Sequence, residues 1–419
     1  MLLGQETTAT LRETIDAYTQ RPNGIPGLVY IVVDRDGRYV FAYASGKRGL
    51  GELEDMTLDT TFWIASCTKL VTTIAAMQLV ESGKVRLDSE EDIQLILPEL
   101  SRISVLEEGA DGALKLVDQQ RKITLRMLLT HTAGFGYSFS NRKLKKWFEP
   151  VGINEFDDQD RDVYTQPLVN QPGSAWEYGI GIDWAGRLVE RMSGLSLDDY
   201  CRLHIFEPLG IQRMTFFPTA EMKKNLAYLH RRNEDGSIQL SEHGHLMRRP
   251  LLLSTPSQVQ ATSNSGGAGL FSSCIEYCKI IATLLNQGKD PVSSNQVLRE
   301  DTVKEMFSNQ IPQFPDFARN QEPVCKPGLM NDDSELYPQP GNPPQGWGLS
   351  FFSLLQPDPT GRAAGTAWWS GLANLIWWAD METGIGGMLA TQILPYGDSQ
   401  VFQCQASVER KIYADLVKG

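Results

Sequence analysis

Residues 62–84, FWIASCTKLVTTIAAMQLVESGK, decide the fold class of this chain. Apolar residues occur on every side of the segment from about Ser66 to Val80, and Gly83 follows as a stop signal, which predicts a largely buried helix. A lysine, Lys69, nevertheless stands in the first turn, three residues after Ser66. Residues three apart on a helix share one face, so the Ser66 hydroxyl and the Lys69 amine can come within hydrogen-bonding reach.

The Ser66–Lys69 pair has two interpretations. Burial disfavours the charged form of a lysine and lowers its pKa, so a neutral Lys69 amine could take the proton of the Ser66 hydroxyl and activate it as a nucleophile. Alternatively, Ser66 caps the helix and the Lys69 ammonium reaches solvent. The same spacing occurs in SNRK at 140–143. The pair alone therefore does not decide between the two.

Composition excludes several classes of protein. The chain has 419 residues, 41% of them hydrophobic, which is enough for a large core. A net charge of −12 argues against a nucleic-acid partner. The sequence shows no long uncharged apolar run and no signal sequence, so we expect no membrane span and a cytoplasmic location. The six scattered cysteines predict free thiols, and Cys274 and Cys278, one helical turn apart, are interpreted as core residues rather than metal ligands.

The order of patterns along the chain predicts one α+β unit. Two strands are expected around an Asp36-Gly37 turn in 27–48, and further strands in 346–355, 367–380 and 384–394, before a terminal helix from about 398. Helical patterns lie between them, as at 124–134 and 182–194. We therefore expect a sheet assembled from both ends of a single domain, with lobes formed by 1–90 plus 255–419 and by 91–254. The segment 308–345, rich in Pro, Asn, Gln and Asp, is expected to be a lid or wall of a binding cleft, or else disordered.

Several motifs follow SCTKL in a characteristic order: ITLRMLLTHTAGFGY (123–137), PGSAWEYGIGIDWAGRLVERMSG (172–194), GGAGLFSS (266–273) and WWSGLANLIWW (368–378). Together they resemble the serine β-lactamase and penicillin-binding-protein-like family, in the branch of class C β-lactamases, family VIII esterases and fungal acyltransferases. Spacing is most similar to fungal acyltransferases that place a short branched acyl group on a polyketide alcohol in statin biosynthesis. The resemblance covers nearly the whole chain and implies an antiparallel sheet flanked by helices, with an inserted, mostly helical lobe.

By this resemblance, Ser66 matches the family nucleophile, Lys69 its activating base and Tyr178 the tyrosine that relays a proton to the leaving group. Trp369, Ser370, Gly371 and Leu372 occupy the place of the family's Lys-Thr-Gly strand and its next residue. The backbone N–H groups of Ser66 and Leu372 would form the oxyanion hole. Gly371 would let substrate approach the strand closely, unless it only marks a bulge.

Two departures from the family pattern bear on the substrate. Trp369 replaces the lysine that helps to hold a β-lactam carboxylate. Ile180 replaces the asparagine of the family's Tyr-x-Asn motif and cannot hydrogen-bond a substrate amide. We therefore expect an ester or thioester acyl donor, with Trp369 and Ile180 beside the substrate.

Four tryptophans surround the predicted active-site strand. Strand alternation sends Trp369 and Trp377 to one face, and Trp368 and Trp378 to the other. One pair could line an apolar pocket, while core packing is the alternative.

The chain's histidines carry weaker signals. His131 with Asp183 would suggest a Ser-His-Asp triad, but the motif resembles a family loop in which the histidine supports structure. His243 and His245 lack a third ligand, and the glycines at 266–273 lack nucleotide-binding spacing. We expect no metal and no cofactor.

The expected function is that of a serine acyl enzyme. It would pass an acyl group from a small-molecule donor (an ester, acyl-coenzyme A or an acyl carrier protein) through acyl-Ser66 to the alcohol of a secondary metabolite. If water is the acceptor, the enzyme is a carboxylesterase. Hydrolysis of a lactam or peptide is disfavoured by Ile180 and Trp369, and a catalytically silent binding protein is disfavoured by the presence of Ser66, Lys69 and Tyr178.

Overall fold

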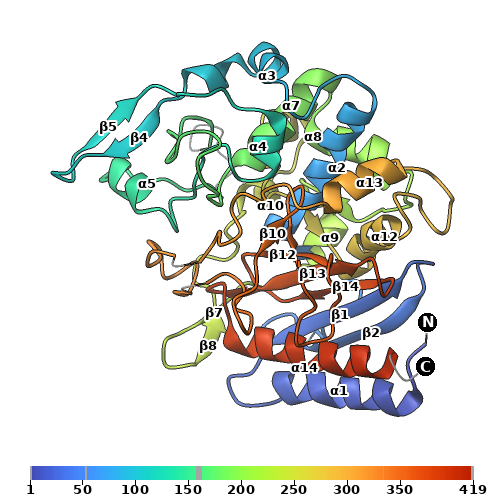
Figure 1. Cartoon of the computed structure of the whole chain (residues 1–419). Helices are drawn as coiled ribbons and strands as arrows, with labels where there is room; N and C mark the ends of the chain where they lie inside the picture. Colours follow the sequence, from blue (N-terminus) through green and yellow to red (C-terminus); the bar gives the residue numbers. More distant parts are fainter. Residues whose placement is uncertain (1, 52–53, 157–162, 320, 334, 417–419) are drawn as a thin grey trace.

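The computed structural model describes residues 2–416 apart from 52–53, 157–162, 320 and 334. These residues form an antiparallel sheet layered with helices, and a second, mostly helical lobe stacked on it (Figure 1). The α+β class expected from the sequence is confirmed. No helix among the described residues is long and apolar enough to cross a membrane.

The main sheet has seven strands and is built from both ends of the chain. Its spatial order is β10 (Gly346–Trp347), β11 (Phe352–Ser353), β12 (Ala367–Gly371), β13 (Leu375–Asp380), β14 (Ile385–Ala390), β1 (Gly27–Asp34) and β2 (Tyr39–Gly46). Strand β1 pairs with β14, with Tyr30 opposite Leu389. The N-terminal hairpin is therefore completed by strands that follow more than 300 residues later.

The first hairpin forms where the sequence predicts it. Gly37 has φ of 77°, a left-handed conformation that glycine adopts without steric cost, so the Asp36-Gly37 pair can turn the chain. All eight residues of β1 are buried, which fits its continuous apolar run, because helices cover both faces of the sheet.

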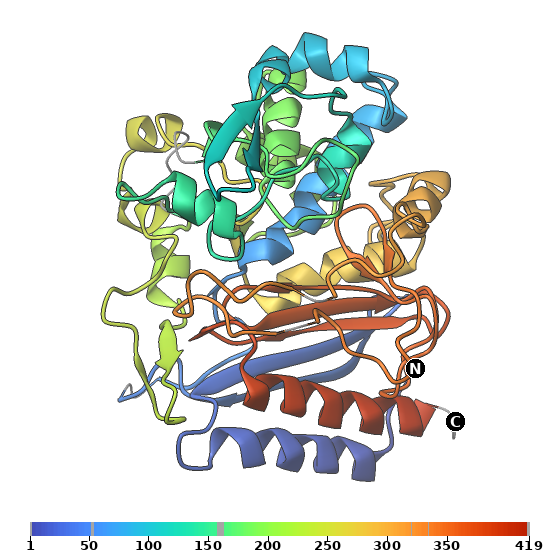
Figure 2. The same cartoon turned by 60° about the vertical axis from the view of Figure 1, so that its left-hand side comes forward.

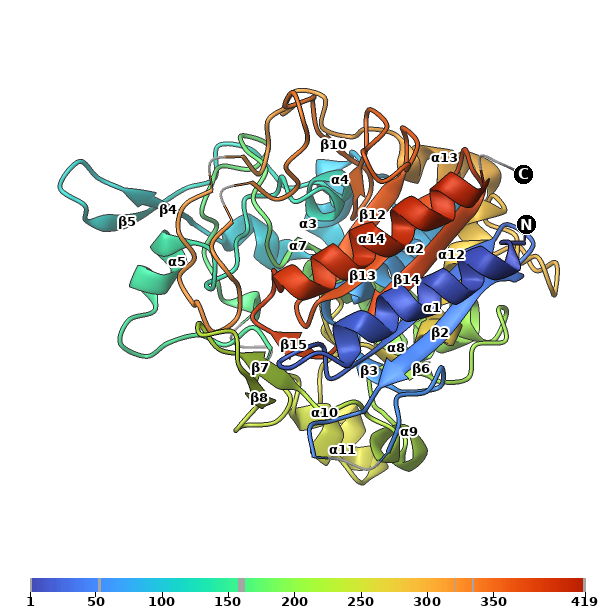
Figure 3. The ribbon, with the colours of Figure 1, turned by 90° about the horizontal axis from the view of Figure 1, so that it is seen from below.

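Helices cover the two faces of the sheet in different ways. Helices α1 (Gln5–Thr19) and α14 (Ser399–Leu416) lie side by side across one face, and the views from the side and from below agree on this (Figures 2 and 3). Helix α12 (Cys274–Leu285) packs on the other face against β1, β13 and β14. Helix α13 (Glu300–Phe307) follows it.

The second lobe consists mainly of short helices. They are α3 (Glu90–Ile96), a 3₁₀ turn (Pro98–Arg102), α4 (Leu125–Leu129), α5 (Arg142–Trp147), α7 (Gly181–Ser193), α8 (Leu197–Cys201) and a π-helical turn (Arg202–Phe206). A hairpin of β4 (Val105–Glu108) and β5 (Leu114–Val117), which the sequence did not predict, projects beside α5 (Figure 1). Each strand has only four residues, and β4 runs from buried Val105 and Leu106 to half-buried Glu107 and Glu108, so the sequence carries no clear strand pattern here.

Two small sheets join segments that are distant in the sequence. One consists of β3 (Phe62–Trp63), β9 (Phe271–Ser272) and β6 (Met214–Thr215), and the other of β15 (Ile393–Leu394), β7 (His230–Arg232) and β8 (Ile238–Leu240). Three more short helices are α9 (Ala220–Lys224), α10 (Arg249–Leu252) and α11 (Pro256–Gln260). Strands β6 and β7 thus pair with strands from the C-terminal half, while the lobe boundary at residue 254 stays a prediction.

The helix that opened the sequence analysis lies between the two lobes. A 3₁₀ turn, Ala65–Cys67, leads into α2 (Thr68–Glu81), and the first ten residues of α2 are all buried. Ala65 has φ of 45°, which is unfavourable for a residue with a side chain and sharpens the entry into the helix. The turn places Ser66 at the junction of α2 with β12.

Candidate active site

Ser66 and Lys69 are in direct contact. The Lys69 Nζ atom lies 3.2 Å from the Ser66 Oγ atom and also donates to the Tyr137 hydroxyl at 3.1 Å and to the Gly267 carbonyl oxygen at 2.9 Å. Lys69 is fully buried, and burial lowers its pKa to about 7 against the opposing charge of Asp183. Since all three acceptors are uncharged, a proton on Lys69 is held weakly, and the neutral amine is accessible near pH 7.

The ring of Tyr178 also lies close to the Lys69 amine. The Lys69 Nζ atom is 4.7 Å from the centroid of the Tyr178 ring, and the Trp369 Nε1–H donates to the Tyr178 hydroxyl at 3.1 Å. Burial raises the pKa of the Tyr178 phenol, and its hydrogen bonds to Ser66 and Trp369 act in the opposite direction. The structure therefore brings together the three residues that the family resemblance assigns to catalysis.

Tyr137 is a member of this cluster that the sequence analysis missed. Its hydroxyl accepts from Lys69, and its ring centroid is 5.2 Å from that of Tyr178. Burial raises the pKa of the Tyr137 phenol, so the hydroxyl remains a neutral partner for the lysine. The only signal in the sequence was its place two residues after Phe135, at the end of the THTAGFGY motif.

The carboxyl group of Asp183 is hydrogen-bonded to the segment that contacts Lys69, not to a histidine. One oxygen of its buried carboxyl accepts from the Gly267 N–H and from the Ser265 hydroxyl, each at 2.9 Å. A Cβ atom on Gly267 would lie 2.3 Å from the other oxygen, so only glycine fits there. Asp183 therefore helps to position Gly267, whose carbonyl oxygen accepts from Lys69.

The imidazole ring of His131 packs against the ring of Tyr178. Its ring centroid is 4.7 Å from that of Tyr178, and its Nδ1 atom accepts from the Gly179 N–H at 3.3 Å. Burial lowers the pKa of the imidazole well below its usual value. His131 is thus a neutral ring that supports the loop carrying Tyr178. This arrangement does not support a Ser-His-Asp triad.

Strand β12 packs tightly against the turn that carries Ser66. A Cβ atom on Gly371 would lie 2.6 Å from the Ile64 carbonyl oxygen, so backbone packing excludes a side chain here. Gly371 also lines the cleft, and close approach of substrate to it stays a prediction. Ser66 and Leu372 both line the same cleft. Their backbone N–H groups stay the predicted oxyanion hole.

The other residues predicted to contact substrate differ in whether they line the cleft. Trp369 and Ser370 line the cleft, and the Ser370 hydroxyl hydrogen-bonds that of Tyr396 at 2.8 Å. Ile180 is fully buried at the N-cap of α7 and is outside the set of residues that line the cleft. Its contact with substrate therefore stays a prediction without geometric support.

The tryptophan pairs follow the expected alternation. Trp369 is opposite Trp377, and Trp368 is opposite Trp378, across the β12–β13 hairpin. Trp369 lines the cleft, whereas Trp377 packs against Tyr277 of α12 in the core. Of this pair, only Trp369 is part of the cleft lining, and Trp377 is a core residue.

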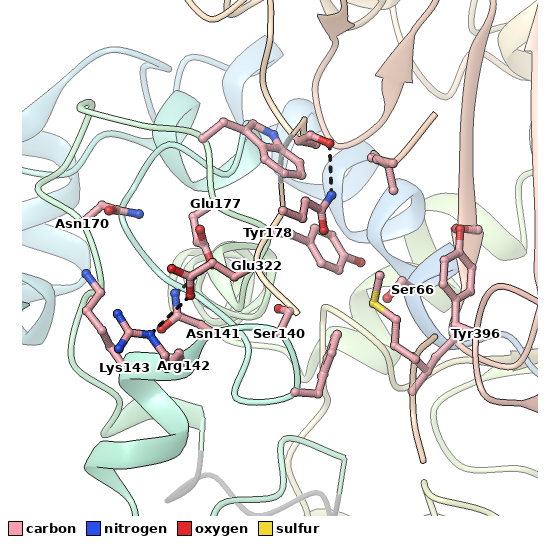
Figure 4. Close-up of a pocket in the computed structure, with 18 of the residues that line it drawn as sticks. Ser66, Ser140, Asn141, Arg142, Lys143, Asn170, Glu177, Tyr178, Glu322 and Tyr396 are labelled. Atoms are coloured by element: carbon pink, nitrogen blue, oxygen red, sulfur yellow. Dashed lines mark hydrogen bonds and ion pairs between the residues drawn. The ribbon is translucent and has the colours of Figure 1, made fainter. Parts of the chain in front are cut away.

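The cleft that opens at Ser66 has a volume of about 680 Å³. Its lining contains an apolar group and a polar group, and Figure 4 shows the labelled residues Asn141, Arg142, Lys143, Asn170, Glu177 and Glu322 at the end away from Ser66. The apolar group is Phe139, Phe156, Trp176, Met330, Leu336, Trp369 and Leu372, and the polar group is Glu107, Glu108, Asn141, Arg142, Lys143, Asn170, Glu177 and Glu322. Residues between 318 and 336 supply part of the lining, so the segment 308–345 contributes a wall of the cleft.

No group of three or more His, Cys, Asp or Glu side chains in the described part of the chain is arranged to hold a metal ion. Cys274 and Cys278 are buried free thiols in α12. The Nε2 atom of His245 is 2.9 Å from the Ala227 carbonyl oxygen, so this histidine is engaged in a loop contact.

Known proteins resemble this chain over almost its whole length. A family model described as beta-lactamase matches residues 11–402. Lovastatin esterase of Penicillium rubens is 31% identical, with 93% of this chain and 94% of that protein covered. Monacolin J acid methylbutanoyltransferase of Aspergillus terreus is 30% identical over 98% of this chain and 96% of that protein. The solved structure of a mutant of simvastatin synthase from Aspergillus terreus superposes with a TM-score of 0.80 at 29% identity, covering 99% of this chain and 96% of that one. The chain belongs to the β-lactamase family.

Proposed function

We propose that this enzyme transfers an acyl group from an ester or thioester donor to an alcohol of a secondary metabolite, through an acyl group held on Ser66. The observation that carries the proposal is the 3.2 Å contact between the Ser66 hydroxyl and a buried Lys69 amine whose pKa is lowered to about 7. An esterase and an acyltransferase are among the relatives of this chain, and both names describe the movement of an acyl group.

Acylation proceeds in two steps in this proposal, and the proton that Lys69 takes in the first step reaches the leaving group in the second. The neutral Lys69 amine takes the Ser66 proton as Oγ attacks the acyl carbonyl carbon, and the backbone N–H groups of Ser66 and Leu372 stabilise the oxyanion. The carbon–oxygen or carbon–sulfur bond of the donor then breaks, and the leaving group takes a proton through Tyr178. The acceptor alcohol repeats the sequence in reverse, giving its proton to the site and taking the acyl group from Ser66.

An alcohol is favoured over water because of the cleft. A volume of about 680 Å³ is suited to a drug-sized molecule, which is more than a short acyl chain needs. The apolar wall around Trp369 can hold a hydrophobic acceptor and reduce the access of water to the acyl group. Hydrolysis remains the alternative function, in which the same acyl-Ser66 reacts with water.

The donor is proposed to be a small ester, acyl-coenzyme A or an acyl carrier protein. Trp369 supplies no cation for a lactam carboxylate, and its indole N–H is already bonded to Tyr178, so a lactam or peptide substrate is disfavoured. A silent binding protein is disfavoured by the Ser66, Lys69 and Tyr178 arrangement. We place the enzyme in the cytoplasm, with no nucleic-acid partner because its net charge is −12.

The acceptor can be tested by product partitioning. The enzyme is incubated with p-nitrophenyl butyrate and a series of primary alcohols, and free butyrate is separated from the butyrate esters by chromatography. An acyltransferase forms mainly the ester at alcohol concentrations far below that of water. Free butyrate as the sole product with every alcohol would instead establish the carboxylesterase.

A further inference from the structure

The polar end of the cleft contains a carboxyl group whose hydrogen bond comes from an uncharged amide. Glu177 directly precedes Tyr178 and lines the cleft, and its Oε1 atom accepts from the Asn141 Nδ2–H at 3.0 Å. In Figure 4, Glu177, Asn141 and Glu322 point toward one another at the end of the cleft away from Ser66. Burial raises the pKa of the Glu177 carboxyl.

Asn141 holds Glu177 in a defined orientation. The Asn141 Oδ1 atom caps α5 by accepting from the Leu144 N–H at 3.2 Å, so its amide N–H₂ group is directed away from the helix and onto Glu177. The backbone N–H of Glu177 donates to the His131 carbonyl oxygen at 2.9 Å. Asn141 therefore orients the carboxyl, and the His131 carbonyl oxygen fixes the backbone that carries it.

The cations that line this end of the cleft already have acceptors. Arg142 pairs with Glu108 at 2.8 Å and with Glu322 at 3.6 Å. The Lys143 Nζ atom donates to the carbonyl oxygens of Leu106 and Val169.

Arg319, the third cation of the lining, is 2.7 Å from Glu335 and 2.5 Å from Asp316, which are both outside the lining. Glu107 and Glu108 are likewise near cations outside the lining, at 3.6 Å from Lys115 and 3.8 Å from Lys146. Among the described lining residues, this leaves the carboxyl groups of Glu177 and Glu322 beside Arg142 and Lys143. Because Arg142 and Lys143 already have acceptors, a substrate carboxylate placed against Glu177 would meet another carboxyl group without a free cation, whereas a hydroxyl group would not be repelled.

We propose that Glu177, oriented by Asn141, binds a second hydroxyl group of the acceptor, so that the acceptor is a diol or polyol without a carboxylate at this end. The inference rests on the proposed acyl transfer and adds the chemical class of the acceptor. A hydroxyl group suits this position because it can donate to an ionised carboxyl and accept from a protonated one. An acceptor that lacked it would leave a partly buried carboxyl without compensation, which is how such sites discriminate.

The experiment compares matched acceptors on the butyryl enzyme. Wild type is first shown to form butyryl-Ser66 from p-nitrophenyl butyrate, and kcat/KM for transfer is then measured with α,ω-diols, mono-alcohols and ω-hydroxy acids of equal chain length. We expect the best diol to exceed its mono-alcohol, and Glu177→Ala to reduce that ratio by about tenfold, the typical effect of one hydrogen bond to a charged group.

Two further variants separate binding from a structural effect. Asn141→Ser keeps a good helix cap but removes the amide N–H₂, so the diol preference should fall by less than in Glu177→Ala while α5 stays folded. Glu177→Gln should retain part of the diol preference and should raise transfer to the ω-hydroxy acid severalfold, because it removes a negative charge. Glu234→Gln, at an exposed position in the β7–β8 connection, is the matched charge control.

Either of two results would overturn the inference. One is a diol to mono-alcohol ratio that is the same in wild type and Glu177→Ala, and the other is faster transfer by wild type to the hydroxy acid than to the diol. Absence of butyryl-Ser66 in the wild type would instead refute the acyl-transfer function itself, so the two failures are distinguishable.

Discussion

Two buried cations in this molecule have opposite surroundings. Lys69, at the junction of the lobes, donates only to uncharged oxygens, and burial lowers its pKa to about 7. Arg362, between the sheet and α14, is paired with Glu409 through its Nε atom at 3.0 Å. Burial acts to lower the pKa of Arg362, but the Glu409 carboxylate outweighs it and the pKa is raised. A carboxylate partner thus keeps a buried cation charged, so that it serves the structure. Neutral acceptors instead let a buried lysine lose and regain its proton.

The largest expected effect is on catalysis at Lys69. Lys69→Met removes the base while keeping an unbranched side chain, so the rate of butyryl-Ser66 formation should fall by about 10² to 10⁴-fold, the usual contribution of a general base. Stopped-flow release of p-nitrophenol measures it. Stability in urea at pH 7 should not fall, because burial disfavours the Lys69 ammonium and lowers its pKa from 10.5 to about 7, a cost that methionine does not have. An unchanged acylation rate would show that Lys69 is not the base.

The matched change at Arg362 should act on stability instead. Arg362→Met leaves Glu409 buried without its cation, and removal of one partner of a buried pair costs about 3–5 kcal/mol. Urea unfolding measures the loss, and the acylation rate per folded molecule should stay within about twofold. A double variant, Arg362→Met with Glu409→Gln, should recover part of the stability, and no recovery would mean that the pair is not the cause.

The pH dependence should report Lys69 alone. Acylation needs the neutral amine, so its rate should fall about tenfold per pH unit below the pKa of about 7 and level off above it. The profile of kcat/KM between pH 5 and 9 checks this. A pH-independent rate across that range would contradict the assignment of the base.

The same pKa has a consequence for folding. The pKa of Lys69 is about 7 in the folded chain, whereas an ordinary lysine has a pKa of 10.5. Between pH 7 and pH 10.5 the unfolded chain therefore binds more protons than the folded chain. The stability of wild type relative to Lys69→Met should therefore rise with pH across that window. Parallel urea titrations at pH 7 and pH 9.5 test the sign, and a falling difference would refute it.

The smallest expected effect concerns the hydroxyl of Tyr137. Tyr137→Phe removes one of the three acceptors of Lys69, so acylation should slow by about threefold to tenfold. The midpoint of the pH profile should also shift down, since the ammonium form loses an acceptor. An unaltered rate and midpoint in the Tyr137→Phe variant would exclude Tyr137 from the site.

The sequence was sufficient for the parts of the site that depend on short spacings. Ser66 and Lys69 are one helical turn apart, and Tyr178 is in a recognisable motif, so their meeting could be expected. Tyr137 could not, because neither a short spacing nor an assigned motif position connects it to Lys69, which it contacts across 68 residues of the chain. The reason for Gly371 was also beyond the sequence, since the Ile64 carbonyl oxygen that excludes a side chain belongs to a distant turn.

The same distinction applies to the fold. The Asp36-Gly37 hairpin and the burial of β1 follow from local residues. The β4–β5 hairpin does not, because its strands have only four residues each and are too short to carry a clear alternation. Nor does the parallel pairing of β7 with β15, which joins His230 to Ile393 and is set by packing rather than by pattern.

The most direct test of the acyl-enzyme is intact-protein mass spectrometry after incubation with p-nitrophenyl butyrate. Wild type should carry a single butyryl group that peptide mapping places on Ser66, with a burst of p-nitrophenol of matching amount, and Ser66→Ala should show neither. A butyryl group retained in Ser66→Ala, or turnover by that variant at the wild-type rate, would contradict the account.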